Sequence, residues 1–367
     1  MAPTPGRVKA GANRVALRAA SDLSGLCGAH RRRRGILLST CLLAFVAFFL
    51  APSAARAAEP ASCAPDVQAL ASAQIEAALH EADQGKAAAQ EIVLGPAPDR
   101  GFLWRIERDG RTSWLYGTVH VGRAAWLIPG PLVLQAIKAS DTIALELDVQ
   151  DADIQRQLAE GMRAKPGEAV PKALEARLQA QLAAQCLPPA AMAQLSPMVQ
   201  LAALTTLAAR ADGLDPAFAI DSFLATIARV LGKQVVSLET PEAQLALIRG
   251  DPKTADERLD SGLADLEQGK VRPMLLRVAS IWDEGRADEL ARYEAWCDCA
   301  DTEAERAELK RLLDDRNPPL AERIARLHAG GQRVFAAVGS LHMFGPQGLP
   351  QLLAQRGFEV RRIEFKR

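Results

Sequence analysis

The sequence predicts an α/β protein with a mixed sheet, built from strands near both ends of its body and capped by a large helical insertion at about residues 151–330. Two observations lead to this prediction. Strand-like runs lie between residues 102 and 119 and return at 333–340 and 359–363. The long stretch between them is rich in Ala, Leu and Gln with helical periodicity. Strands separated by helices favour crossover connections within one sheet.

The first two strands are expected to form a hairpin. Residues 102–108 alternate apolar and polar side chains, Asp109-Gly110 is a strong two-residue turn signal, and residues 112–119 are again rich in β-forming side chains. The later elements expected along the chain are a helix at 131–139, strands at 142–149, 234–238, 333–340 and 359–363, and a helix at 349–355.

The first 57 residues have the organisation of a secretory signal peptide. Four arginines at 31–34 precede an uncharged apolar run at 35–51, and Ala55-Arg56-Ala57 places small residues where a signal peptidase requires them. We expect cleavage and a periplasmic protein. Retention as an inner-membrane anchor is the alternative, although the apolar run is slightly short for a membrane span. Residues 58–100 are then an N-terminal helical extension, and residues 101–367 form the main domain.

Charge is distributed unevenly between this leader and the body. Residues 1–57 hold nine of the 44 Lys and Arg residues but only one of the 44 Asp and Glu residues, so the body is acidic. An acidic body without a basic stripe interleaved with aromatics does not attract phosphate backbones. We therefore expect no nucleic-acid partner, and membrane contact only through an uncleaved leader.

Four cysteines remain in the exported body. Cys63, Cys186, Cys297 and Cys299 could form up to two disulfides, with three possible connectivities. Cys297 and Cys299 are expected to be too close to pair with each other, so Cys63 and Cys186 are their expected partners. A metal site at this Cys-x-Cys is disfavoured, because no histidine or second cysteine pair lies nearby in the sequence.

A repeated Gly-x-x-His pattern marks the ends of two predicted strands. Gly117-Thr118-Val119-His120 ends the hairpin, and Gly339-Ser340-Leu341-His342 ends the late apolar strand. A glycine lets a neighbouring backbone or a ligand approach closely, and each histidine lies where its strand runs out into a loop. Two such imidazoles could share a metal ion or one proton-transfer task. Alternatively, both could be half-buried, hydrogen-bonded structural histidines.

Two carboxylates accompany these histidines. Alternation in residues 143–149 puts Glu146 and Asp148 on one face of a strand, which would be costly if helices covered both faces of the sheet. Glu239 stands at the end of the strand at 234–238. The alternatives are a solvated sheet face for Glu146 and a helix-capping region for Glu239.

These features together resemble the TraB/PrgY/GumN family over roughly residues 102–363. The resemblance is carried by the two Gly-x-x-His motifs, the strand Glu146, Leu238-Glu239-Thr240 with Gln244, and the ending Val338 to Met343 with Gly345 and Gly348-Leu349-Pro350. It implies distant fold kinship with erythromycin esterase and with a haem-binding lipoprotein group. The family is also similar to the Tiki proteins of animals, which are described as divalent-metal-dependent peptidases.

The resemblance also implies a set of site residues. His120, Glu146 and His342 match the active-site pattern of the family. Asp221 falls where the family has a Gly-aliphatic-Asp element, although Ala219 replaces the glycine here. The pair Arg316-Asn317 resembles a recurrent pair before the last long helix.

Three functions are compatible with these residues. The first is an exported metal-dependent peptidase or hydrolase. His120 and His342 would bind the cation, and Glu146 would be a third ligand or a general base. The ion could be zinc, or manganese or cobalt if Asp148, Asp221 or Glu239 added oxygen ligands. The second is a non-enzymatic periplasmic module that binds a peptide or a haem-like ligand in the same pocket. The third is a structural partner of an envelope complex.

Overall fold

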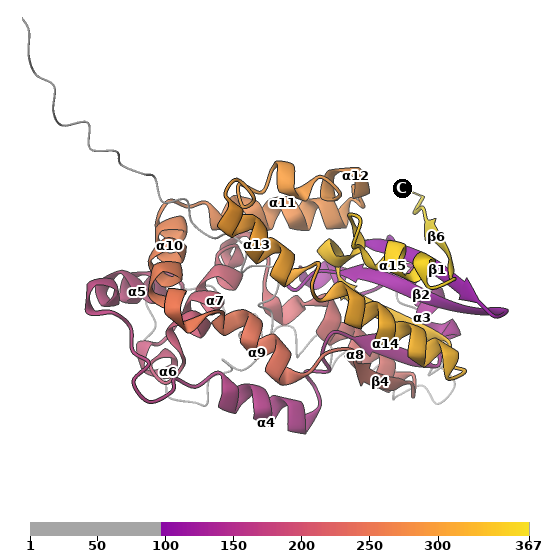
Figure 1. Ribbon diagram of the computed structural model, residues 1–367, viewed down its shortest axis with the longest axis horizontal. Helices are drawn as coiled ribbons and strands as arrows, with labels where there is room; N and C mark the ends of the chain where they lie inside the picture. The colour runs from indigo at the N-terminus through magenta and orange to yellow at the C-terminus, as the bar shows by residue number, and fades with distance from the viewer. Residues whose placement is uncertain (1–96, 367) are drawn as a thin grey trace, which may run out of the picture. The chain divides into compact units, whose positions relative to one another are not determined.

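A computed structural model describes residues 97–366 (Figure 1). The expected signal peptide and most of the expected N-terminal helical extension lie outside these residues. Within residues 97–366, no helix is both long and apolar enough to cross a membrane.

The hairpin starts a six-stranded mixed sheet. Strands β1 (Phe102–Arg108) and β2 (Arg111–Thr118) pair antiparallel. Asp109 and Gly110 both have positive φ, 53° and 69°, as a type I′ turn requires. The α/β class with a mixed sheet is confirmed, since strands from both ends of the described chain share this sheet.

The central strands are parallel and come from distant parts of the sequence. The strand order is β4-β3-β5-β2-β1-β6. Strand β5 (Val334–Gly339) pairs parallel with β2 on one side and with β3 (Thr142–Leu145) on the other. Strand β4 (Gln234–Ser237) extends the sheet beside β3, and β6 (Glu359–Ile363) pairs antiparallel with β1. Strands β3 and β5 are buried along their whole length, which explains why they are apolar apart from Thr142.

Helices supply the remaining layers. In Figure 1, α14 and α15 lie with the sheet, while α4–α7, α9 and α10 gather at the other side of the view. The α-helices are α3 (Pro131–Ala139), α4 (Ala152–Gly161), α5 (Lys172–Ala184), α6 (Pro189–Met192), α7 (Pro197–Leu207), α8 (Ile220–Val230), α9 (Pro241–Arg249), α10 (Ala255–Glu267), α11 (Val271–Asp283), α12 (Ala287–Leu290), α13 (Glu303–Leu312), α14 (Asn317–Ala329) and α15 (Leu349–Gln355). The insertion is thus helical except where β4 joins the sheet.

Two strands end earlier than the sequence pattern predicts. The strand expected at 142–149 stops at Leu145, so Glu146 and Asp148 follow β3 instead of lying within it. The strand expected at 333–340 stops at Gly339, and the 3-10 helix η7 (Ser340–Met343) follows at once. The apolar pattern of the sequence does not show where these strands end, because most residues that follow them are also buried.

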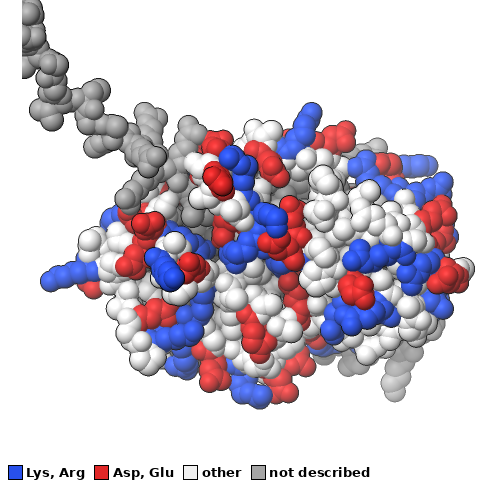
Figure 2. Space-filling view, viewed as in Figure 1, with Lys and Arg blue, Asp and Glu red and all other residues white. Residues whose placement is uncertain are grey.

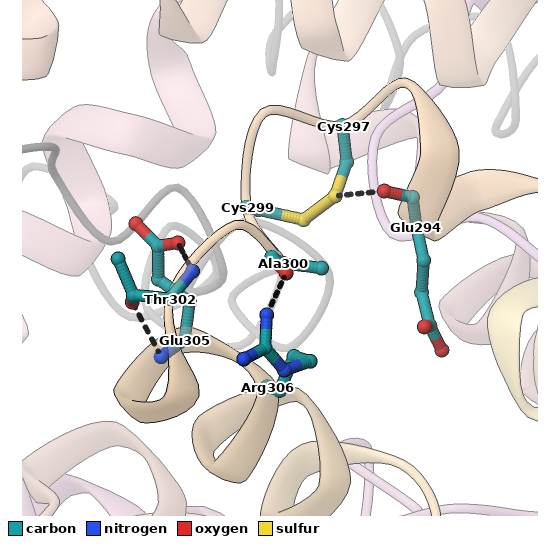
Figure 3. Close-up of a disulfide and its surroundings, with 7 residues drawn as sticks. All are labelled: Glu294, Cys297, Cys299, Ala300, Thr302, Glu305 and Arg306. Carbon is teal, nitrogen blue, oxygen red and sulfur yellow. Dashed lines mark hydrogen bonds between the residues drawn. A yellow bond between two sulfur atoms is a disulfide. The ribbon is translucent and has the colours of Figure 1, made fainter.

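The expected disulfide pairing was wrong for Cys297 and Cys299, which are joined to each other (Figure 3). Asp298 between them has φ 54°, a left-handed conformation that aspartate tolerates better than most residues. The chain therefore doubles back and brings the two Cα atoms to 5.0 Å, within the usual range for a disulfide. Cys186 is also disulfide-bonded. The expected role of Cys63 lies outside the described residues.

Basic and acidic side chains are interspersed on the face shown in Figure 2. Many of them form ion pairs at the surface. Arg177 of α5, for example, bonds both Asp260 and Glu267 of α10. Each such exposed pair contributes little to stability, but the mixture keeps charges of one sign from accumulating.

Candidate functional site

The two Gly-x-x-His motifs end neighbouring parallel strands. In the β2–β5 ladder, Gly117 is opposite Val338 and Thr118 is opposite Gly339. Strand β3, which leads into Glu146, lies on the other side of β5. The carboxyl ends of three adjacent parallel strands therefore deliver His120, Glu146 and the segment of His342 to one edge, where ligand sites of α/β sheets gather.

Gly117 allows β2 to pack tightly against the segment that carries His342. A side chain at position 117 would begin 2.9 Å from Ser340 Oγ and 3.3 Å from Ser340 Cα. The Ser340 hydroxyl occupies this space and donates a hydrogen bond to the Thr118 carbonyl at 2.8 Å. The first glycine of the repeated pattern thus joins the two motifs to each other.

Gly339 has a different role, because it leaves open the space between the candidate residues. A side chain at position 339 would begin 3.2 Å from Glu146 Oε1, 3.4 Å from His120 Nε2 and 3.6 Å from His342 Cδ2. The structure therefore brings the three side chains together around one point. Their catalytic role stays a prediction.

His120 is held by a carboxylate on the helix that begins beside it. Asp221 lies in the first turn of α8 and accepts a 2.8 Å hydrogen bond from His120 Nδ1 and a 2.6 Å bond from the Thr118 hydroxyl. His120 Nε2 lies 3.8 Å from Glu146 Oε1. Burial lowers the pKa of His120, but the charges of Asp221 and Glu146 outweigh burial and raise it to about 9. The imidazole is therefore protonated at neutral pH.

Glu146 accepts hydrogen bonds from three directions. Oε1 accepts from the backbone N–H of Gly339 at 2.7 Å, and Oε2 accepts from Arg316 Nη2 at 2.6 Å and from Gln244 Nε2 at 3.4 Å. Burial raises the pKa of Glu146, but Arg316 and His120 outweigh this and hold it well below its usual range. Glu146 thus stays ionised although only 2% of its side chain is exposed.

Arg316 connects the remaining members of the cluster. Its Nε and Nη2 bond the two carboxylate oxygens of Glu239 at 2.8 and 2.5 Å. Its Nη1 donates to His342 Nε2 at 2.9 Å. Glu239 is placed beside Glu146 by the backbone, since its N–H donates to the Glu146 carbonyl at 2.9 Å. One guanidinium therefore pairs with two buried carboxylates.

The contacts of His342 fix its tautomer. A guanidinium only donates hydrogen bonds, so Nε2 of His342 must accept the bond from Arg316. Nδ1 therefore carries the proton and donates to Asn317 Oδ1 at 2.7 Å. Burial and the charge of Arg316 lower the pKa of His342 to about 3. The two histidines consequently differ in charge at neutral pH, His120 being charged and His342 neutral.

A cavity of about 40 Å³ opens beside these histidines. His120, His342, Thr118 and Ser340 line one side of it, together with Gly339. Helix α11 and Leu313 line the other side, which agrees with the expected capping role of the helical insertion. The volume is enough for one or more water molecules, since one needs roughly 10–15 Å³.

The side chains as arranged here do not fit a divalent cation. A ligating His342 and Glu146 would each direct a lone pair at the metal, but both direct lone pairs at the Arg316 guanidinium. That cation would also repel a metal ion a few ångströms away. Within residues 97–366, no group of three or more His, Cys, Asp and Glu side chains is placed to hold a metal.

Of the other residues singled out in the sequence, Asp221, Glu239 and Arg316 all join the cluster. Asp148 does not, because its carboxylate bonds Arg229 Nη2 at 2.6 Å. Reasoning from spacing alone gave no role to Asn317, Gln244 or Thr118. Asn317 and Gln244 did belong to the motifs that carry the family resemblance, and Thr118 lies within the first Gly-x-x-His motif.

The fold and this buried cluster of histidines, carboxylates and one arginine define an α/β protein with its site at the carboxyl edge of a parallel sheet. The family model of the TraB/PrgY/gumN family matches residues 102–362. The chain belongs to the TraB/PrgY/gumN family. No curated protein and no solved structure matches it at a significant level.

Proposed function

We propose that this protein is a hydrolase of peptide bonds, with its reaction centre at the space that Gly339 leaves open. The observation that supports this most directly is the pair of groups beside that space. A Cβ atom at position 339 would lie 3.4 Å from Nε2 of the protonated His120 and 3.2 Å from Oε1 of the ionised Glu146. A proton donor and a proton acceptor side by side are the requirement for general acid–base hydrolysis. The choice of peptides follows from the resemblance of the family to the Tiki proteins.

Each residue of the cluster has a defined task in this proposal. Water in the space gives a proton to Glu146 while its oxygen attacks the carbonyl carbon. His120 Nε2 gives its proton to the leaving nitrogen as the C–N bond breaks. The proton on Glu146 then returns to His120, so that water has been added across the amide. Asp221 orients the imidazole and keeps it charged, as carboxylates do for catalytic histidines.

Arg316 has two opposing effects on Glu146 in this proposal, because it keeps the carboxylate ionised but also makes it a weaker base. It keeps Glu146 ionised at every pH of interest, although a carboxylate of such low pKa is a weak base. A substrate carbonyl that drew the guanidinium toward itself would restore basicity to Glu146. Arg316 would then also face the negative charge that develops on the carbonyl oxygen.

The proposal is tested by incubating the purified protein with a mixed peptide library and identifying products by mass spectrometry. We expect cleavage by the native chain and none by Gly339→Ala, because the added methyl group fills the reaction space. Gly330→Ala is the matched control, since nothing lies within 3.4 Å of a side chain at that position. Equal activity of Gly339→Ala and the control would rule out this reaction centre.

A metal-dependent peptidase, with zinc, manganese or cobalt at His120, Glu146 and His342, remains the alternative that the resemblance implies. It would require Arg316 to leave the position that it holds here. Exhaustive treatment with a chelator separates the two routes. We expect cleavage to persist, whereas loss of cleavage with recovery on adding one metal would establish the metal route.

A binding module without turnover is favoured by one observation, the largely aliphatic far wall of the cavity. Peptides that bind the native chain and are recovered uncut would support this function. Export to the periplasm is also part of our proposal, and the Cys297–Cys299 disulfide supports it, because disulfides persist mainly in oxidising compartments.

A further inference from the structure

The wall of the cavity opposite the histidines is made by one face of helix α11. Its residues on this wall are spaced by one helical turn, as positions 274, 275, 278 and 279 show. Besides these four residues of α11, the aliphatic residues that line the cavity are Val119, Val121, Leu313 and Leu341. No Lys, Arg, Asp or Glu is among the lining residues.

Such a lining selects against charged groups. Moving a charged side chain from water into an aliphatic wall without a partner is strongly unfavourable. His120 is the single charged group on the cavity surface, and its own charge is balanced by Asp221 and Glu146. An ionic side chain of a substrate would thus find no counter-ion among the lining residues.

The volume limits the size of the group that enters. An apolar cavity of roughly 150 Å³ accommodates benzene. The present cavity, at about 40 Å³, is far smaller. It suits a group between a methyl and an isopropyl, and an aromatic side chain would not fit. Ala279, which is 3% exposed, keeps the volume from closing, because any larger residue there would project into it.

We propose that this cavity is a specificity pocket for a small aliphatic side chain, alanine to valine in size, on a residue that flanks the cleaved bond. The inference rests on the proposed hydrolase function and names the substrate class for the same site. The pocket adjoins His120 and Gly339, so a side chain seated there brings its own backbone to the space between His120 and Glu146. Helix α11 therefore sets which peptide bonds are placed for reaction.

The test uses one peptide sequence that the native chain cleaves, with the residue before the cleaved bond, and separately the residue after it, varied through Ala, Val, Phe and Lys. At one of the two positions we expect kcat/KM for Val to exceed that for Phe and Lys by at least about tenfold, because one methylene in an apolar pocket changes discrimination by roughly 10- to 200-fold. Equal values for all four residues at both positions would overturn the inference.

Two variants change the pocket in opposite directions. Ala279→Leu fills it, and should lower kcat/KM for the Val peptide by about tenfold or more while affecting the Ala peptide less. Val278→Ala enlarges it and should raise the value for Phe relative to Val. Leu276→Ala is the control, since Leu276 is also half-buried on α11 but does not line the cavity. If Ala279→Leu does not fold, Ala279→Val makes the same test with less crowding.

Binding measurements distinguish failure of this inference from failure of the proposed function. Calorimetry with the same peptides and the His120→Gln variant reports on the pocket without turnover. If the native chain cleaves nothing while the Val peptide still binds at least tenfold more tightly than the Phe peptide, the hydrolase proposal fails and the pocket stands. If Ala279→Leu changes the affinity for every peptide by the same factor, the pocket is refuted even where cleavage is observed.

Discussion

The Arg316 guanidinium lies 2.6 Å from the carboxylate of Glu146, and 7% and 2% of the two side chains are exposed. The two residues are 170 positions apart in the sequence. Their ion pair joins the end of β3 to the start of α14, and Glu239 shares the same guanidinium from the end of β4. The cluster is therefore both a candidate reaction centre and a structural link between sheet and helices.

Removing the guanidinium is expected to destabilise the protein strongly. Arg316→Met leaves the buried Glu239 without a counter-ion and Glu146 with only the imidazolium of His120 at 3.8 Å, and the loss of such a buried partner typically lowers the free energy of unfolding by about 3–5 kcal/mol. Urea denaturation of the variant and the native chain measures the change. The double variant Arg316→Met/Glu146→Gln should recover part of the loss, because one uncompensated charge has gone. A loss below about 1 kcal/mol in Arg316→Met, typical of an exposed pair, would contradict the burial described here.

The pH dependence of turnover should report the pKa of His120. As a proton donor His120 must be protonated, so kcat/KM is expected to be constant near neutrality and to fall as the pH rises through about 9. Asp221→Asn removes the charge that raises this pKa, and the fall should then occur at lower pH. Activity that rises through pH 9 would instead mean that His120 acts as a base.

Stability in mild acid should depend on His342. Its pKa is about 3 in the folded chain, below the ordinary value of 6.5, so the neutral form stabilises the fold fully above pH 6.5 and less as the pH falls toward 3. At pH 5 the loss is about 2 kcal/mol, from 1.36 kcal/mol per pKa unit. Urea denaturation of the native chain and of His342→Gln between pH 7 and 5 measures it as a difference, because the raised pKa of His120 changes stability in the opposite direction.

The other described histidine of low pKa acts in the same direction and supplies a control. Burial lowers the pKa of His328, which donates from Nε2 to the Arg108 carbonyl. His342→Gln should remove a larger share of the acid loss than His328→Gln. An unchanged pH dependence in His342→Gln would mean that His342 is not neutral in the folded protein.

The Cys297–Cys299 disulfide should be found within a single tryptic peptide. Cleavage after Arg292 and Arg306 releases both cysteines together, so the oxidised peptide is lighter than the reduced one by two hydrogens. Mass spectrometry without reduction checks this. Linkage of either cysteine to a peptide from elsewhere in the chain would contradict the structure.

A side chain at Gly117 should affect the fold more than one at Gly339. Gly117→Ala places a methyl group 2.9 Å from Ser340 Oγ, which is held by its own hydrogen bond. Such overpacking commonly lowers stability by about 1–3 kcal/mol. Thermal unfolding of Gly117→Ala, Gly339→Ala and Gly330→Ala should rank the first as least stable. Equal melting temperatures would show that the two motifs do not need this close contact.

Elements of the fold that depend on residues close together in the sequence could be predicted from it. The hairpin follows from Asp109-Gly110, because both residues tolerate positive φ. The adjacency of β2 and β5 agrees with the repeated Gly-x-x-His pattern, because two histidines can share one task only if their strands end at the same edge of the sheet. The early end of β3 at Leu145 was missed, because the following residues stay buried and continue the apolar alternation.

The centre of the site was less predictable, because it depends on contacts over long distances in the sequence. Arg316 was recognised only through a family resemblance, and nothing local showed that one guanidinium would face both Glu146 and Glu239. The disulfide was mispredicted for a similar reason. Sequence spacing did not show that Asp298 would take a left-handed conformation.

The position of β5 also governs the order in which the protein can assemble. This strand lies between β2 and β3, yet it is synthesised more than 180 residues after β3. A chain emerging from the ribosome therefore contains β2 and β3 long before β5, the strand that joins them, has been synthesised. Such non-local pairing slows folding. Under the export that we propose, this delay would keep the chain unfolded enough to be translocated, and completion of the sheet and assembly of the site would be the same late event.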